Sequence, residues 1–144
     1  MKILVFDPGE NTGWVAANVS YSGESDIIAA GTAVRNHLNI ADLFNTYEPD
    51  IVVFERFNLY PGMAKTLSWN TFYPCEVIGV IRYLCDKYQI PYYEQAPSIK
   101  KYAGGLQQDW IELRRKFAVT EHSKDAYLHL KYFLRNHKEK LLVK

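Results

Sequence analysis

The chain has 144 residues, a length typical of one domain with one substantial core. Hydrophobic residues make up 48% and charged residues 23% of the chain, which excludes a disordered tail or a fibrous protein. The net charge is only +1, so overall basicity gives no reason to expect a nucleic-acid partner. We expect a single domain over residues 1–144.

The first part of the chain predicts a strand-rich unit. Lys2–Phe6 is a short apolar run that Pro8 and Gly9 end, as in a buried strand. Trp14–Tyr21 and Asp26–Val34 alternate loosely, and a Ser-Gly turn separates them. Together these segments predict a three-stranded antiparallel meander. Apolar residues at helical spacing then predict a helix over residues 38–47.

The second part alternates strands and helices. Ile51–Phe54 is another fully apolar strand, and residues 56–73, rich in aromatic residues and Asn, predict a mobile loop with some helix. A helix is expected from Pro74 to about Tyr88, because proline suits the first position of a helix. Its apolar residues over 77–84 cover a wide face, and we expect part of that face to lie in a homodimer interface. Pro91–Gln95 predicts a short strand.

The last part is helical. Ser98–Tyr102 predicts a helical turn, Gly104–Gly105 a flexible joint, and Trp110–Phe117 a helix. The last helix is expected from about His122 to beyond Leu134. The order βββαβαβα predicts an α/β fold with a mixed five-stranded sheet flanked by helices.

Acidic residues stand where the two most buried strands end. Asp7 follows the first and Glu55 the second, while Asp125 lies near the start of the last helix, three residues after His122. Residues three apart share one helix face, so His122 and Asp125 can point together. Carboxylates that converge repel one another unless a divalent cation joins them, and Mg²⁺ prefers carboxylate oxygens. This pattern favours a magnesium site that acts on a phosphodiester, although each residue by itself also suits a turn or a helix cap.

Basic residues are concentrated in the second part of the chain. Residues 1–94 hold 6 Lys and Arg against 11 Asp and Glu, whereas residues 95–144 hold 11 against 5. This asymmetry favours a polyanionic partner, although a solvated basic helix would give the same pattern. The candidates for phosphate contacts are Lys100, Lys101, Arg114, Arg115, Lys116, Lys124 and Lys131. The aromatic residues Phe57, Tyr60, Trp69, Phe72 and Tyr73 could stack on bases of an opened strand or form a small satellite core.

The cysteines and the apolar runs bear on the cellular compartment. On one helix, Cys75 and Cys85 would lie about 15 Å apart, too far for a disulfide. No zinc-type spacing occurs, so a reduced, cytoplasmic protein is expected. The apolar run at the start is too short for a signal peptide, and no run reaches the roughly 18 residues of a membrane span.

The ordered motifs resemble a known family. DPGENTGW after the first strand resembles the RuvC-type Holliday junction resolvases of the RNase H-like superfamily. VVFERF resembles the family's second acidic strand, and PCEVIGVIRYL resembles the helix after it. PYYEQAPSIKKYAGG is similar to the fifth strand with its basic segment, and EHSKDAYLHLKYFL to the terminal acidic helix. The short length is most similar to the phage-encoded members, which act in the host cytoplasm.

The resemblance implies a fold and a site. It implies an RNase H-like fold in which Asp7, Glu55, His122 and Asp125 are catalytic and bind two Mg²⁺ ions, with Mn²⁺ as a substitute. One ion would activate the attacking water, and the other would stabilise the departing 3′ oxygen.

The resemblance also implies how the chain would hold DNA. Lys100 falls at a DNA-contacting lysine of the family, and Arg114, Arg115 and Lys116 are candidates for a further basic contact. Phe57 lies near the aromatic residue that helps to open the junction. The family acts as a homodimer.

The sequence therefore predicts a Mg²⁺-dependent endodeoxyribonuclease that cleaves four-way or otherwise branched DNA in recombination and repair. An RNase H-type hydrolase of RNA–DNA hybrids would have the same acidic site, so only a comparison of substrates separates the two. A DNA-binding scaffold that has lost activity is a third possibility. An actin-like nucleotide-binding module would need a second phosphate loop and a longer chain.

Overall fold

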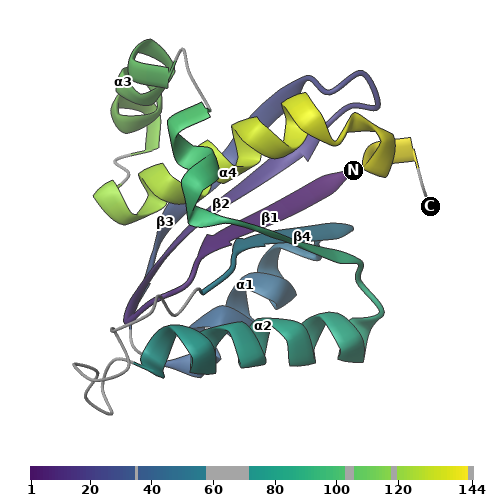
Figure 1. Ribbon diagram of the computed structural model, residues 1–144, viewed down its shortest axis with the longest axis vertical. Coiled ribbons are helices and arrows are strands. Elements are labelled where there is room, and N and C mark those ends of the chain that lie inside the picture. The colour runs from purple at the N-terminus through teal and green to yellow at the C-terminus, as the bar shows by residue number, and fades with distance from the viewer. Residues whose placement is uncertain (35, 58–71, 103–105, 118–119, 143–144) are drawn as a thin grey trace.

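The computed structural model describes residues 1–34, 36–57, 72–102, 106–117 and 120–142, and these form a sheet between two layers of helices (Figure 1). The strands are β1 (Lys2–Asp7), β2 (Asn11–Val19), β3 (Ser25–Val34), β4 (Ile51–Glu55) and β5 (Tyr92–Gln95). Their order in the sheet is β3-β2-β1-β4-β5. The pairs β1–β2 and β2–β3 are antiparallel, whereas β1–β4 and β4–β5 are parallel. The predicted mixed five-stranded α/β sheet is confirmed.

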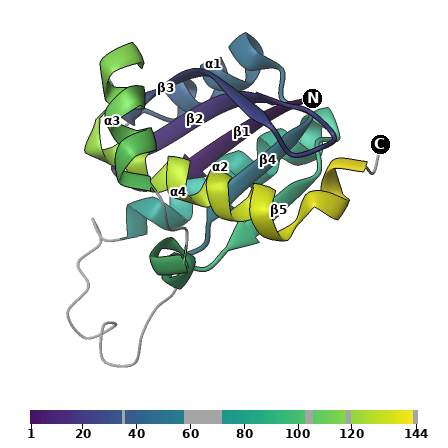
Figure 2. The same ribbon diagram turned by 90° about the horizontal axis from the view of Figure 1, so that it is seen from above.

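The helices are α1 (His37–Tyr47), α2 (Tyr73–Tyr88), η3 (Pro97–Tyr102), α3 (Leu106–Phe117), α4 (Glu121–Asn136) and η4 (Lys138–Leu142). Helices α1 and α2 cover one face of the sheet (Figure 1). Helix α4 lies across β2, β1 and β4 on the other face (Figure 2). Helix α3 begins four residues before the predicted start. Most of the predicted loop over 56–73 and the predicted joint at Gly104–Gly105 lie outside the described residues.

The alternation of side chains along the central strands builds two cores. Ile3, Val5 and Val53 point to the α4 face, together with Leu130 and Phe133 of that helix. The residues between them point to the opposite face. There Leu4, Phe6, Val52 and Phe54 pack with Ile40, Phe44, Ile78 and Ile81 of α1 and α2. Because β1 and β4 are buried on both faces, their sequences read as continuous apolar runs.

The apolar face of α2 is part of the chain's own core. Val77, Ile78, Ile81 and Leu84 are all at most 6% exposed. The chain itself therefore covers these four side chains, while Val80 on the same helix is only half-buried. A homodimer interface on part of this face stays a prediction. The outer side of the same helix carries Tyr83, which is 63% exposed.

The two cysteines both lie on α2, as the sequence predicts. Cys75 is exposed, Cys85 is buried, and both are free thiols. Burial raises the pKa of the Cys85 thiol to about 12, so it is an inert core group. None of the helices in the described ranges is both long and apolar enough to cross a membrane.

Candidate active site

Two neighbouring parallel strands bring the first two carboxylates together. Phe6 of β1 is in register with Phe54 of β4, so Asp7 and Glu55 follow at the same edge of the sheet. By alternation both share the side of Val5 and Val53, which is the side that α4 covers. The ends of β1 and β4 therefore place the carboxylates of Asp7 and Glu55 on the side of the sheet that α4 covers.

Helix α4 supplies the third carboxylate, and Gly13 lets this helix come close. Thr120 caps the helix by accepting a hydrogen bond from the Ser123 N–H, as Thr commonly does. Gly13 lies opposite Asp7 on β2. A Cβ atom at Gly13 would overlap the backbone carbonyl of His122. Only glycine therefore allows this approach, which places the N-terminal part of α4, including Asp125, beside the strand ends.

A lysine ammonium lies between two of the carboxylates. Lys100 of η3 places its Nζ 3.0 Å from Oε2 of Glu55 and 3.3 Å from Oδ2 of Asp125. Burial works against the charged form of Lys100, but the carboxylates of Glu55, Asp125 and Asp7 outweigh it and raise the lysine pKa. Lys100 is thus held as a cation at the centre of the acidic cluster.

The acidic cluster strongly affects the pKa of Asp7. Burial, followed by the neighbouring carboxylates of Glu55 and Asp125, raises the pKa of Asp7 to about 7. The single Lys100 cation does not balance three carboxylates. A divalent cation would supply the missing positive charge.

A buried histidine and a buried glutamine stand behind Glu55, and the sequence analysis missed both. His129 Nε2 lies 2.8 Å from Oε2 of Glu55, and His129 Nδ1 lies 3.1 Å from Nε2 of Gln95. Burial works to raise the pKa of Glu55, but the hydrogen bonds from His129 and Lys100 outweigh it and lower that pKa. The sequence carries one signal for His129: it lies four residues after Asp125, and residues at that spacing share a helix face.

His122 is not brought to the carboxylates. Its side chain is exposed on the first turn of α4, and within the described part of the chain it makes no hydrogen bond or ion pair with Asp7, Glu55 or Asp125. Its backbone carbonyl packs on Gly13 instead. A catalytic or metal-binding role for His122 stays a prediction.

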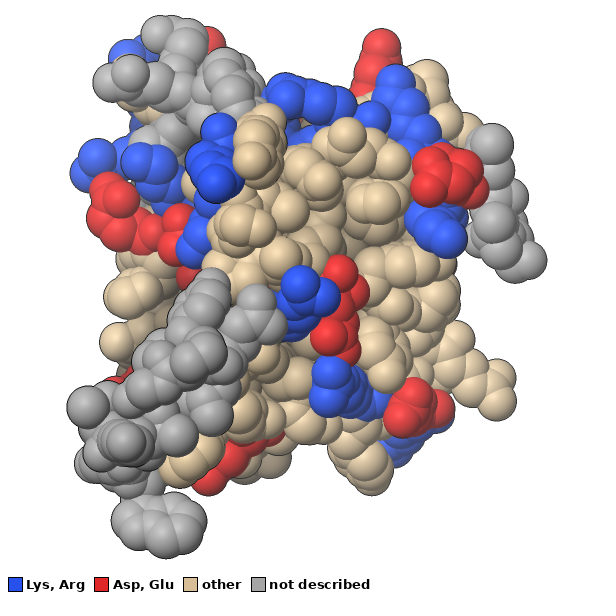
Figure 3. Space-filling model, in the orientation of Figure 1, with Lys and Arg blue, Asp and Glu red and all other residues tan. Residues whose placement is uncertain are grey.

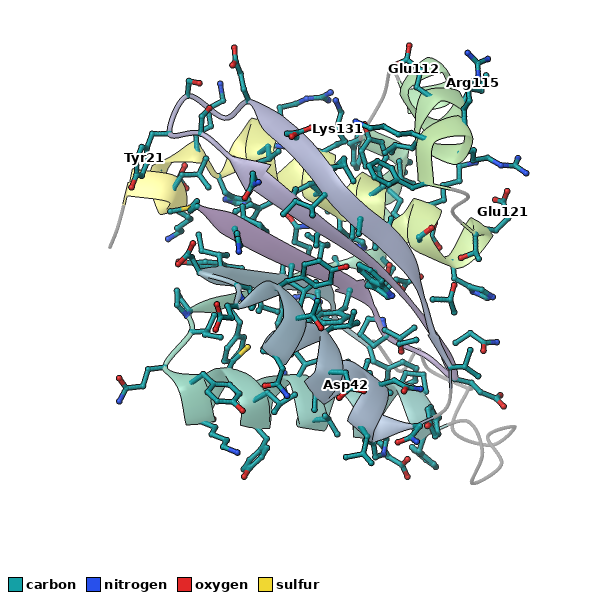
Figure 4. The ribbon with its side chains drawn as sticks, turned by 180° about the vertical axis from the view of Figure 1, so that it is seen from behind. Tyr21, Asp42, Glu112, Arg115, Glu121 and Lys131 are labelled. Atoms are coloured by element: carbon teal, nitrogen blue, oxygen red, sulfur yellow. The ribbon has the colours of Figure 1, made fainter. Side chains whose placement is uncertain are left out.

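The other predicted basic DNA-binding side chains lie on η3 and α3. Lys101 is exposed, with its Nζ 5.2 Å from the Tyr102 ring centroid. Arg114, Arg115 and Lys116 are exposed on α3, and Arg115 projects from that helix away from the sheet (Figure 4). In Figure 3, Lys and Arg side chains gather over the part of the molecule that α3 and α4 form. The basic surface and the acidic cluster therefore belong to the same side of the sheet.

Phe57 is half-buried and packs against the α1–α2 core. It lines a cavity of about 210 Å³ together with Pro8, Glu55, Arg56, Pro74, Ile78 and Pro97. Of the other predicted stacking residues, Tyr73 stacks on His37 and Phe72 is 39% exposed. Tyr60 and Trp69 lie outside the described residues.

The donor set suits a hard divalent cation. Three carboxylates converge, and Mg²⁺ binds such oxygens while it keeps several waters. Among the described residues, no three His, Cys, Asp or Glu side chains form a ready metal-binding group. Lys100 occupies the position between Glu55 and Asp125 where a cation satisfies both. The carboxylate oxygens are chemically suited to a magnesium ion, which would have to share the cluster with Lys100 or displace its ammonium.

Comparison with solved structures decides the fold. The chain matches Thermus thermophilus RuvC in complex with a Holliday junction substrate, with a TM-score of 0.67 and 15% identity over 96% of this chain and 98% of that one. It has the RNase H-like fold of the RuvC-type resolvases.

Two solved Holliday junction resolvases, from fowlpox virus and from yeast mitochondria, also share this fold. The fowlpox virus enzyme, solved with substrate junction DNA, matches with a TM-score of 0.57 and 16% identity, over 99% of this chain and 100% of that one. The yeast mitochondrial enzyme matches with a TM-score of 0.56 and 13% identity, over 97% and 84%. Comparison of the sequence with protein-family models and with curated proteins finds no match.

Proposed function

We propose that the chain is a single-domain endonuclease that cleaves four-way or otherwise branched DNA. The observation that carries this proposal is the convergence of Asp7, Glu55 and Asp125 around Lys100, at the edge of a sheet with the RuvC fold. Carboxylates at such a strand edge suit metal-assisted phosphodiester hydrolysis.

The proposed cofactor is Mg²⁺, for which Mn²⁺ can substitute. Asp7, Glu55 and Asp125 would hold it. When bound, the metal lowers the pKa of water and neutralises charge on the phosphate that is attacked. His122 is a proposed further ligand, because it lies three residues before Asp125 on α4, and residues at that spacing share a helix face.

The chain's own residues would position the DNA. Lys100 remains charged beside the carboxylates and can pair with a phosphate oxygen next to the bond that breaks. Lys101, Arg114, Arg115 and Lys116 are exposed and can contact phosphates farther along the arms. Phe57, at the cavity beside Glu55, is a candidate contact for an unpaired base.

We further propose that the protein acts as a homodimer. A four-way junction has two equivalent strands to cut, and a two-fold dimer presents two matching sites. The exposed side of α2, around Tyr83, is the proposed interface. Sedimentation of the wild type as a monomer at micromolar concentration, with and without junction DNA, would contradict this proposal.

The function is tested by cleavage of matched substrates in Mg²⁺: a four-way junction, a three-way junction, a flap, a duplex and an RNA–DNA hybrid. We expect the four-way or branched DNA to be cut fastest, with little cleavage of the duplex. Preferential cleavage of the hybrid would indicate an RNase H-type enzyme. Junction binding without cleavage in either Mg²⁺ or Mn²⁺ would indicate a DNA-binding scaffold.

A further inference from the structure

A buried polar pair lies directly behind the Glu55 carboxylate. His129 is 0% exposed and Gln95 is 5% exposed. Gln95 is in register with Glu55 on the adjacent strand, and His129 lies one helical turn after Asp125. Elements β4, β5 and α4 therefore meet at three side chains that share hydrogen bonds.

The hydrogen bonds fix which ring nitrogen of His129 carries the proton. Gln95 Nε2 lies 3.0 Å from the backbone carbonyl oxygen of His129, so this atom is a donor. The opposite amide orientation would place two carbonyl oxygens against each other. The same Nε2 also faces His129 Nδ1 at 3.1 Å. Nδ1 must then accept, and the proton of the neutral ring lies on Nε2.

We propose that Gln95 and His129 are positioning residues that hold the Glu55 carboxylate for a divalent cation. Gln95 selects the Nε2–H tautomer of His129, and this Nε2–H group donates a hydrogen bond to Oε2 of Glu55. The inference rests on the proposed function, because it concerns the same carboxylate.

The hydrogen bonds around Glu55 indicate how Gln95 and His129 would affect metal binding. His129 and Lys100 both bond to Oε2, and no other described residue bonds to Oε1 of Glu55. Oε2 is therefore fixed, and within the described part of the chain Oε1 is left available to a cation. Because the ring is neutral, it orients the carboxylate without cancelling its charge. Partners of this kind behind a metal ligand typically contribute about 10–100-fold to metal affinity.

The first test measures Mn²⁺ affinity by calorimetry on the full chain without DNA. We expect His129→Leu to weaken Mn²⁺ binding by about tenfold or more. His129→Gln keeps an Nε2–H donor at a similar reach, and its affinity should stay within about threefold of wild type. Leu130→Val is the matched control, since Leu130 is equally buried on α4 but belongs to the apolar core. Its unfolding free energy should fall without a change in Mn²⁺ affinity.

The second test reads the tautomer directly. Nitrogen NMR of the His129 side chain in the metal-free wild type should show a proton on Nε2 and none on Nδ1. Gln95→Leu should lose this single tautomer. Because this reading needs neither metal nor a His129 variant, it holds even if His129→Leu does not fold.

An Nδ1–H tautomer in the wild type would overturn the inference, and so would unchanged Mn²⁺ affinity in a folded His129→Leu protein. Failure of the wild type to bind Mn²⁺ would also overturn it. The proposed function fails separately, if the wild type binds Mn²⁺ with the expected dependence on His129 but cleaves no branched DNA.

Discussion

The protonation of Asp7 links the site to the stability of the metal-free protein. The folded chain holds the Asp7 proton up to about pH 7, whereas the unfolded chain releases it near its ordinary pKa of 3.8. Between these values the folded state binds more protons, so the Asp7 contribution to the free energy of unfolding falls as the pH rises. In the metal-free protein, ionised Asp7 therefore destabilises the folded state at neutral pH, and a bound cation would offset this effect.

Asp7→Asn should remove this penalty. Relative to wild type, the variant should gain stability between about pH 4 and about pH 8, by at most about 4 kcal/mol from a shift of about three pKa units. Urea unfolding in a chelator measures the difference at each pH. Asp42→Asn is the control, because Asp42 is exposed on α1 away from the site (Figure 4). A difference between Asp7→Asn and wild type that does not change with pH would refute the raised pKa.

Lys100 should matter for the reaction more than for DNA affinity. It bonds to Glu55 and Asp125 rather than facing solvent freely. We expect Lys100→Ala to slow cleavage by about 100-fold, the usual scale for one stabilising donor. Junction affinity should stay within about threefold, and Mn²⁺ affinity should not fall, because a competing cation is removed.

Lys101→Ala is the matched control for Lys100→Ala. Lys101 is the next residue but is exposed and points over Tyr102. Its cleavage rate should stay close to wild type when the DNA is saturating. Equal losses in the two variants, in both binding and cleavage, would show that Lys100 acts only as one more phosphate contact.

At the scale of elements, the close approach of β2 and α4 sets the position of Asp125. A methyl group at Gly13 would overlap the carbonyl of His122. We expect Gly13→Ala to lower the unfolding free energy by about 1–3 kcal/mol, as overpacking does. Cleavage should fall by at least about tenfold, because displacement of Asp125, a proposed metal ligand, would lower the rate steeply.

Gly79→Ala tests whether the effect of Gly13→Ala depends on the position of Gly13 or would follow any replacement of glycine by alanine. Gly79 lies on α2, where a methyl group on its Cα would have no neighbouring atom within 4 Å. In a helix this change should stabilise the protein by about 0.5–1 kcal/mol. A Gly13→Ala protein with the activity and stability of wild type would contradict the assigned approach.

The elements also show which parts of the fold the sequence predicts and why. Apolar runs and turn residues locate all five strands, and Asp7 and Glu55 are evident because a carboxylate ends each buried strand. The start of α3 at Leu106 is missed. The sequence also does not show that the chain itself covers most of the apolar face of α2. A helix with a wide apolar face has the same sequence pattern whether its own chain or a partner subunit covers that face. His129 and Gln95 are missed because their roles depend on contacts between α4, β4 and β5.

For the whole molecule, the separation of charge determines how DNA would be held. An acidic cluster repels phosphates, so attraction must come from the basic surface that α3 and α4 provide (Figure 3). Arg114 and Arg115 are exposed there, and Arg114 has only Glu121 nearby among the described residues, at 3.9 Å. Such an exposed pair costs little to break.

The double change Arg114→Ala and Arg115→Ala should weaken junction binding and leave the cleavage rate at saturating DNA nearly unchanged. The slope of log affinity against log salt should fall by roughly one or two units, at about 0.9 per lost duplex phosphate contact. A salt titration of junction binding measures it. Unchanged affinity and slope would mean that these side chains are only solvated.

The proposed active site consists of three converging carboxylates that would hold the metal for cleavage of branched DNA. Its most direct test is single-turnover cleavage of a four-way junction in Mg²⁺ by wild type and by Asp7→Asn, with junction affinity measured for both. We predict that Asp7→Asn binds the junction at least as tightly as wild type, because phosphate repulsion falls, and cleaves it at least about 1000-fold more slowly. Cleavage by Asp7→Asn within about tenfold of the wild-type rate would contradict the assignment of this cluster as the active site.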